Sequence, residues 1–260
     1  EEGLGGARVM IEDGLFDRFP IQSMFAMHNW PQMKPGTVGI NDGPMMAAAD
    51  RITIEINGRG GHGAHAYQTV DVVLVAGHII TAVQGIVSRN VRPLDSAVVS
   101  ICAVQAGDLG AFSVLPGSAT LVGTVRSFDP AVQEMVERRI QEVCNGVAMG
   151  FGASANVRYE RIYPATINTE SEARFTGDVA VSLVGAENVV RDLEPSMGAE
   201  DFSFMLQNKP GAYLRIGLGM GAGNSTLHNS RYDFNDDILP LGAALHAGLI
   251  EQGMPLTSAQ

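Results

Sequence analysis

Residues 51–57 alternate three isoleucines with polar residues. This period of two predicts a strand with one buried face. Apolar residues then recur at helical spacing from Val72 to Val87, and Thr69 is a suitable N-cap residue just before them. The pattern therefore predicts a strand followed by a helix.

Two runs rich in β-branched residues follow, at 97–104 and 120–128, joined by a connection that contains glycine and proline. Such runs predict a pair of antiparallel strands. Asp129, followed by Pro130, predicts the start of a second helix, because a capping carboxylate precedes a proline at the first helical position.

Residues 155–162 alternate again and predict one more strand. The complete order is strand, helix, strand, strand, helix, strand, which is typical of a ferredoxin-like βαββαβ sandwich. We therefore expect a separate lid domain over residues 51–163. Residues 1–50 and 164–260 are predicted to form an α/β domain that this lid interrupts.

Within the interrupted α/β domain, an apolar strand over residues 21–27 leads to His28. A buried strand over residues 212–218 is followed by a glycine-rich loop that leads to His228. Ligands of open α/β sheets bind at the carboxyl ends of strands. Thr169, with Glu172 three residues later, predicts a capping box at the start of a further helix.

The net charge of −11 makes binding to nucleic acid or to anionic membrane surfaces an unfavourable interpretation. We find no apolar run that approaches the length of a membrane span. Cys102 and Cys144 are both predicted to lie in the core, so neither a disulfide framework nor a CxxC site is expected. This usage fits a reducing compartment, and we expect a cytoplasmic protein.

The run Gly58-x-Gly60-x-x-Gly63 matches the dinucleotide-binding fingerprint. We reject that interpretation because no helix opens directly on the last glycine and an antiparallel strand pair follows. The glycines are better explained as a tight turn that presents His62. On base rates alone, His62 would be a solvated loop histidine.

His28 and His228 each follow an apolar strand and precede an asparagine, so two imidazoles could meet at one sheet edge. A histidine pair with a carboxylate is a common zinc site. Glu1 and Glu2 offer carboxylates, although a charged chain end is usually solvated. His65, His78 and His246 are interpreted as structural.

Six motifs in this order resemble the M20 metallopeptidase family, and most closely its amidohydrolases that act on N-acyl amino acids such as hippurate. The resemblance covers essentially the whole chain and implies a two-domain architecture. The motifs are Glu1-Glu2-Gly-x-Gly-Gly-Ala, His28-Asn29-x-Pro31, Gly58-x-Gly60-Gly61-His62, Gly123-Thr124-Val125-Arg126-Ser127-Phe128, Met197-Gly198-Ala199-Glu200-Asp201-Phe202 and Leu227-His228-Asn229.

The resemblance implies a metal-dependent amidohydrolase. Glu1 would be the general base, and Glu2, His28 and His228 would be metal ligands. The complete family site holds two divalent ions, which could be Zn, Mn, Co or Ni. Metal-activated water would attack the amide carbonyl.

The resemblance also implies a homodimer formed through the lid domain. His62 would reach across this dimer to the developing oxyanion, and Arg126 would pair with the carboxylate of the small-molecule substrate. Ser113 replaces an asparagine that is usual in the family, which leaves the substrate preference open.

The family carries further metal-binding motifs upstream of the Glu1-Glu2 pair, and this sequence does not contain them. We therefore expect an N-terminally truncated catalytic domain. A non-catalytic dimerising module of the same family remains an alternative, as does the less favoured nucleotide-binding protein.

Overall fold

The computed structural model describes residues 5–220 and 225–255. The chain divides into two compact units. The first unit contains Glu1–Met46, Thr166–Ser196 and Glu200–Gln260, and the second contains Ala47–Ala165 with Met197–Ala199. The boundaries expected from the sequence, at residues 51 and 163, fall inside the second unit.

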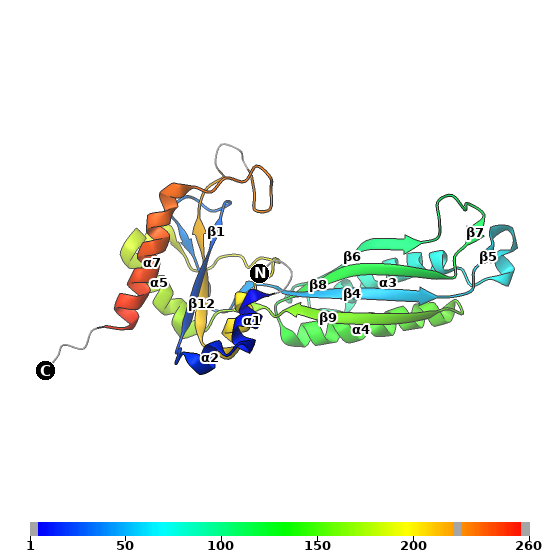
Figure 1. The fold of residues 1–260 in the computed structure, drawn as a ribbon, viewed down its shortest axis with the longest axis horizontal. Helices are drawn as coiled ribbons and strands as arrows, with labels where there is room; N and C mark the ends of the chain where they lie inside the picture. Colours follow the sequence, from blue (N-terminus) through cyan, green and yellow to red (C-terminus); the bar gives the residue numbers. More distant parts are fainter. Residues whose placement is uncertain (1–4, 221–224, 256–260) are drawn as a thin grey trace. The chain divides into compact units, whose positions relative to one another are not determined.

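The first unit is built on a mixed four-stranded sheet in the order β1-β12-β2-β11. The strands are β1 (Met24–Trp30), β12 (Gly211–Gly217), β2 (Val38–Gly39) and β11 (Val189–Val190). β1 and β12 run parallel, side by side (Figure 1), and His28 is in register with Arg215. β3 (Pro44–Met46) and β10 (Thr166–Ile167) form a separate antiparallel pair.

Helices cover both faces of this sheet. Successive side chains of β12 point to opposite faces, and each face has its own apolar cluster with the helices that cover it. One cluster joins Ala212, Leu214 and Ile216 to α5 (Glu170–Val184) and α7 (Leu239–Gly253). The other joins Tyr213 to α1 (Gly6–Glu12) and α6 (Phe202–Asn208), with α2 (Leu15–Arg18) beside it. Met24 and Ala26 of β1 pack in the second cluster. His28 and Trp30 follow at intervals of two residues, so they lie on the same face of the sheet.

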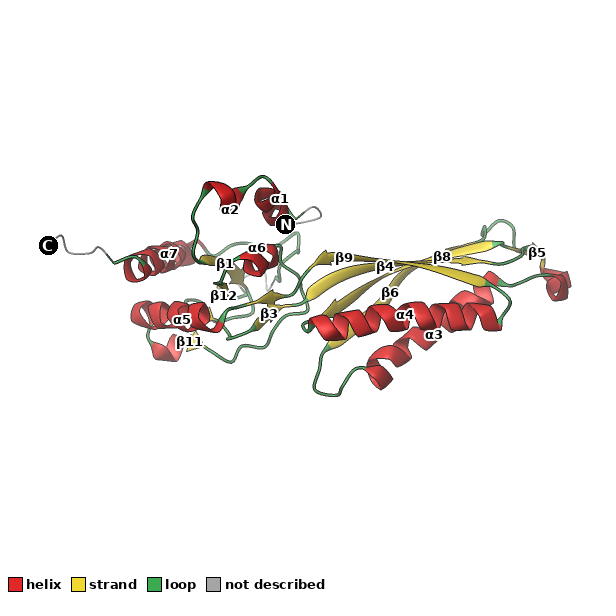
Figure 2. Ribbon diagram, turned by 90° about the horizontal axis from the view of Figure 1, so that it is seen from below, coloured by secondary structure: helices red, strands yellow, loops and turns green. Residues whose placement is uncertain are grey.

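The second unit follows the order strand, helix, strand, strand, helix, strand. Its antiparallel sheet has the order β6-β8-β4-β9. Figure 2 shows both helices on one face of this sheet. The elements are β4 (Ala48–Asn57), α3 (Val72–Asn90), β6 (Ala97–Ala106), β8 (Ser118–Ser127), α4 (Pro130–Gly150) and β9 (Ser154–Tyr163).

Alternation in β8 explains this one-sided cover. Leu121 and Val125 are fully buried in a cluster with residues of both helices, whereas Thr124 and Arg126 lie half-buried on the opposite face. The Asp129 carboxylate accepts a hydrogen bond from the Ala131 N–H and caps α4, as the sequence predicts.

Four expectations are wrong. The N-cap of α3 is Asp71, which accepts from the N–H groups of Val73 and Leu74, while the Thr69 hydroxyl donates to the Ala66 carbonyl. The capping box at Thr169 does not form. Its hydroxyl accepts from the Gly211 N–H instead, and Glu172 accepts from two serine hydroxyls.

The third concerns Cys102, which is exposed, whereas Cys144 is buried as predicted. A β-bulge between Ile101 and Ala103 leaves Cys102 outside the pairing of β6 with β8 and shifts the alternation of the strand.

The helix α3 is long and apolar enough to cross a membrane, judged by length and composition only. The expectation that no apolar run approaches the length of a membrane span is therefore also wrong. Its residues Val75, Ile79, Val83 and Ile86 pack in the core of the second unit. A helix with one face in a protein core passes the same test of length and composition, so this is weak support for a membrane span.

Candidate functional site

His28 lies in the carboxyl-terminal half of β1, where its imidazole has a defined hydrogen bond. Its Nδ1 atom lies 2.7 Å from the carbonyl oxygen of Asn29. A carbonyl oxygen can only accept, so the neutral imidazole carries its proton on Nδ1 and keeps a lone pair on Nε2. Metal-binding histidines are commonly oriented in this way, by a carbonyl that accepts from the other ring nitrogen.

The end of β1 is connected to the loop that contains His228. Asn29 Nδ2 donates to the Tyr232 hydroxyl at 2.5 Å. Two hydrogen bonds to Asn229 form a turn in that loop. The Asn229 side chain accepts from the Arg231 N–H, and the Asn229 carbonyl accepts from the Tyr232 N–H. The bond from Asn29 to Tyr232 therefore joins two segments about two hundred residues apart in sequence. Burial raises the pKa of the Tyr232 hydroxyl, and the hydrogen bond from Asn29 opposes this shift.

His228 itself has an unusual backbone. Its φ of 59° lies in the left-handed region, and among the described residues it is the one non-glycine residue with a positive φ. Such conformations cost free energy and are concentrated at functional sites. The His228 side chain is exposed.

The predicted ligand set is only partly described, because Glu1 and Glu2 lie outside the described residues. Within residues 5–220 and 225–255, no group of three or more His, Cys, Asp or Glu side chains could hold a metal ion. The assignment of Glu2, His28 and His228 as ligands and of Glu1 as the base stays a prediction.

The first described helix is fixed to the start of α6. The Ala7 N–H donates to Asp201 Oδ2 at 2.8 Å, and Glu200, beside it, is 9% exposed. The contact of Asp201 with α1 is long-range, so no local sequence signal predicts it.

Arg215 was not identified from the sequence. It lies in β12, is 2% exposed, and its guanidinium carbon is 3.9 Å from the centre of the Trp30 ring. Burial lowers the pKa of Arg215, although arginine stays charged in proteins. An arginine inside an otherwise apolar strand was the signal that could have singled it out.

His62 is presented on an exposed turn of the second unit. The N–H of Ala64 donates to His62 Nδ1 at 3.1 Å, so the neutral ring carries its proton on Nε2. His65, interpreted above as structural, is also exposed, and the centres of the two imidazole rings are 5.6 Å apart.

The glycines of this turn allow close backbone contacts. A Cβ atom on Gly60 would lie 2.6 Å from the Leu115 carbonyl oxygen, and the Gly63 N–H donates to the Ser113 carbonyl at 2.7 Å. These contacts hold β5 (Gly61–His62) against β7 (Val114–Leu115). Because a 3₁₀ segment, Gly63–Gln68, follows and α3 begins only at Val72, the strand–turn–helix context of a dinucleotide site does not occur here.

Arg126 lies on the helix-free face of the β8 sheet, opposite Ala49 of β4 and Val98 of β6. It is half-buried, and no acidic side chain among the described residues forms an ion pair with it. A guanidinium in this situation can bind an external carboxylate.

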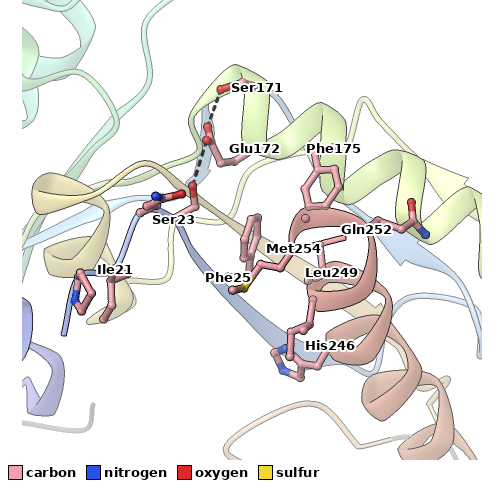
Figure 3. A pocket seen from close by; sticks show the side chains of 14 residues that line it. Ile21, Ser23, Phe25, Ser171, Glu172, Phe175, His246, Leu249, Gln252 and Met254 are labelled. Carbon is pink, nitrogen blue, oxygen red and sulfur yellow. Dashed lines mark hydrogen bonds between the residues drawn. The ribbon is translucent and has the colours of Figure 1, made fainter. Parts of the chain in front are cut away.

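A cavity of about 810 Å³ occurs in the first unit, but it does not contain the predicted site. Figure 3 shows Phe25, Phe175 and Leu249 around it, with Glu172 accepting from two serine hydroxyls. Phe25 belongs to the apolar cluster on the face of the sheet that α5 and α7 cover, whereas the Tyr213 cluster lies on the other face. None of the predicted site residues lines this cavity.

Comparison with known proteins gives consistent matches. The model of "Peptidase family M20/M25/M40" matches residues 1–252. The hippurate hydrolase of Campylobacter jejuni is 39% identical over 249 residues, which are 96% of this chain and 64% of that protein. The IAA-amino acid hydrolase ILR1-like 4 of Arabidopsis thaliana is 34% identical, with 96% of this chain and 57% of that protein covered.

Among solved structures, the Bacillus subtilis YXEP protein is described as a dinuclear metal binding peptidase from the M20 family. It superposes with a TM-score of 0.78 at 28% identity, over 96% of this chain and 62% of that one. The chain thus spans less than two thirds of the length of each of these proteins.

Proposed function

Because the chain belongs to peptidase family M20/M25/M40, we propose that it is part of a metal-dependent hydrolase that cleaves the amide bond of N-acyl amino acids of the hippurate type. The observation that carries this proposal is the 39% identity, over 96% of the chain, to a protein named hippurate hydrolase. A second relative is named IAA-amino acid hydrolase. The products would be a carboxylic acid and a free amino acid.

Of the proposed metal ligands, His28 and His228 lie among the described residues. Oxygen and imidazole nitrogen donors suit Zn, Mn, Co or Ni, and the Nε2 lone pair of His28 is left available by the bond at Nδ1. We assign Glu2, His28 and His228 as ligands and expect two ions in the complete site. When bound, such a metal polarises the amide carbonyl and lowers the pKa of water.

Each remaining site residue has a separate task. Glu1 takes a proton from the attacking water and gives it to the leaving amine as the C–N bond breaks. His62 donates from Nε2–H to the oxyanion that develops on the carbonyl, a role supported by the hydrogen bond it accepts at Nδ1. Arg126 binds the carboxylate of the amino acid part of the substrate.

We also propose that the second unit is a ferredoxin-like lid and forms a homodimer. β6 is an edge strand whose residues Cys102 and Val104 are exposed. Leu109, Phe112 and Val114, in and after the connection that follows β6, are also more than half exposed. An open edge with exposed apolar side chains is a surface suited to a second copy.

A non-catalytic dimerising module is the second candidate. It is favoured by the lack, within residues 5–220 and 225–255, of a group of three or more His, Cys, Asp or Glu side chains that could hold a metal ion. Gel filtration combined with metal analysis separates the two candidates. A folded dimer that takes up no divalent metal supports the second, whereas stoichiometric metal supports the first.

The test of the proposed reaction is hippurate hydrolysis by the longest natural form of this protein and by its Glu1→Gln variant. Loss of a general base is expected to lower kcat by about 100- to 10,000-fold. An unchanged rate in the variant would falsify the assignment of Glu1.

A further inference from the structure

We propose that Arg215 is a positioning residue for His28, acting through the indole ring of Trp30. This role rests on the proposed function, because the orientation of His28 matters only if its imidazole binds a ligand. Three contacts within the first unit support it.

The first contact is between His28 and Trp30, two residues apart on β1. Their ring centres are 5.9 Å apart and their planes make an angle of 71°, so the rings meet edge to face. The Tyr213 ring of β12 lies on the same imidazole, with a centre-to-centre distance of 6.4 Å. The His28 ring is therefore held by two aromatic side chains in addition to its bond to Asn29.

The second contact is between Trp30 and Arg215. The guanidinium carbon lies 3.9 Å from the centre of the indole ring, well within the range of a cation–π interaction. Arg215 is also the residue paired with His28 in the register of β1 and β12. The guanidinium thus fixes the ring that packs against His28.

The third set of contacts fixes Arg215 itself. Its two terminal nitrogens donate to the carbonyl oxygens of Met45 and Glu194, at 2.8 and 3.1 Å. Only a planar fork can bind these two acceptors and stack on an aromatic ring at the same time, so lysine cannot replace it.

Arg215 is costly to keep for stability alone. It is 2% exposed, its Nε atom has no hydrogen-bond partner among the described residues, and no acidic side chain among them forms an ion pair with its guanidinium. A buried cation without a carboxylate is unfavourable, and an apolar side chain of similar volume is often as stable or more stable. A role in holding the Trp30 and His28 rings accounts for its presence.

The test uses the full chain labelled with ¹⁵N-histidine, without metal, at about pH 8, where unperturbed imidazoles are neutral. Two-bond ¹H–¹⁵N correlation spectra report the tautomer of each histidine. In the unchanged protein, His28 is expected in the Nδ1–H form. In Arg215→Lys and Trp30→Leu, the ring is expected to rotate away, and the Nε2–H form that predominates in free imidazoles appears.

Two further variants separate positioning from general destabilisation. Trp30→Phe keeps an aromatic edge and should keep the Nδ1–H form. Ile216→Val, on the opposite face of β12, should lower the Tm and leave the His28 signals unchanged. The proposal is overturned if Arg215→Lys or Trp30→Leu retains the Nδ1–H form, or if Ile216→Val loses it. If Arg215→Lys does not fold, the tautomer of His28 in Trp30→Leu decides whether the proposal stands.

Addition of Zn²⁺ to the same labelled sample tests the proposed function separately. A zinc-induced shift of His28 Nε2 is expected. If no shift occurs but the variants change the tautomer, the metal site is wrong and the positioning role of Arg215 stands.

Discussion

His28 and His62 use their Nδ1 atoms in opposite ways. His28 Nδ1 donates to the Asn29 carbonyl at 2.7 Å, whereas His62 Nδ1 accepts from the Ala64 N–H at 3.1 Å. At Nε2, His28 therefore offers a lone pair and His62 offers a proton. The first arrangement suits a metal ligand, and the second suits a donor to an oxyanion.

Replacement of His28 by alanine should lower the affinity for Zn²⁺ by at least about 100-fold, because a ligand is lost rather than an outer-shell group. Isothermal titration of the longest natural form measures this. His246→Ala is the matched control, since His246 lies in α7 beside the cavity of Figure 3. Equal affinities of the two variants would contradict the assignment of His28.

Replacement of His62 by alanine should lower kcat for hippurate by about 100- to 1,000-fold and change KM little, as expected for a donor that acts in the transition state. His65→Ala is the control on the same exposed turn. If both variants lose activity equally, the effect belongs to the turn and not to the His62 Nε2–H group.

Arg126→Lys should raise KM by about 10-fold or more, because lysine cannot bind a carboxylate through two parallel hydrogen bonds. Steady-state kinetics with an N-acyl amino acid and with the corresponding amide, which lacks the carboxylate, provide the measurement. For the amide substrate, the unchanged protein and Arg126→Lys should have the same KM. A KM unchanged for the acid argues against Arg126 as its partner.

Asp50 should make the stability of the second unit depend on pH. Its carboxylate is 2% exposed and accepts from Gln133 and from the Tyr159 hydroxyl. Burial raises the pKa of Asp50 above 3.8, and both hydrogen bonds oppose that shift. Folding therefore favours the protonated form, and the contribution is largest below pH 3.8 and declines as the pH rises through the higher folded value.

The side chain in Asp50→Asn cannot titrate, so this variant serves as the reference. The Tm difference, unchanged protein minus Asp50→Asn, should fall as the pH rises from 3.8 through the raised pKa of folded Asp50. Thermal unfolding at a series of pH values measures the difference. A difference that stays constant or grows with pH would mean that the folded pKa is not raised.

The open edge of β6 predicts a change in oligomeric state. Val104 is 54% exposed there, and Val104→Lys should shift a dimer towards the monomer because it places a charge in an apolar interface. Sedimentation or light scattering measures the shift. Thr81→Lys, at an exposed position of α3, is the control. A monomeric unchanged protein at micromolar concentration would contradict the dimer.

Local signals predicted most elements of the fold. The start of α4 follows from Asp129 and Pro130 because a cap and its partners are close in sequence. The start of α3 was placed two residues early because Arg59 pairs with Val70, which delays the helix to Asp71. The exposure of Cys102 depends on a bulge that the pattern of residues does not show.

The candidate site was less predictable, because its contacts join distant segments. The positions of His28 and His228 after predicted strands singled them out. Their predicted role as metal ligands came from the resemblance to the M20 family. The link from Asn29 to Tyr232 spans 203 residues, and the stack of Arg215 on Trp30 joins two strands far apart in the chain. The tautomers of His28 and His62 depend on backbone geometry rather than on residue type.

The most direct test of the central claim is the rate of hippurate hydrolysis by the longest natural form of this protein, measured before chelation, after chelation and after a divalent metal is restored. The account predicts that hydrolysis is lost on chelation and returns with Zn²⁺, Mn²⁺, Co²⁺ or Ni²⁺. A rate that is unaffected by removal of the metal would contradict it.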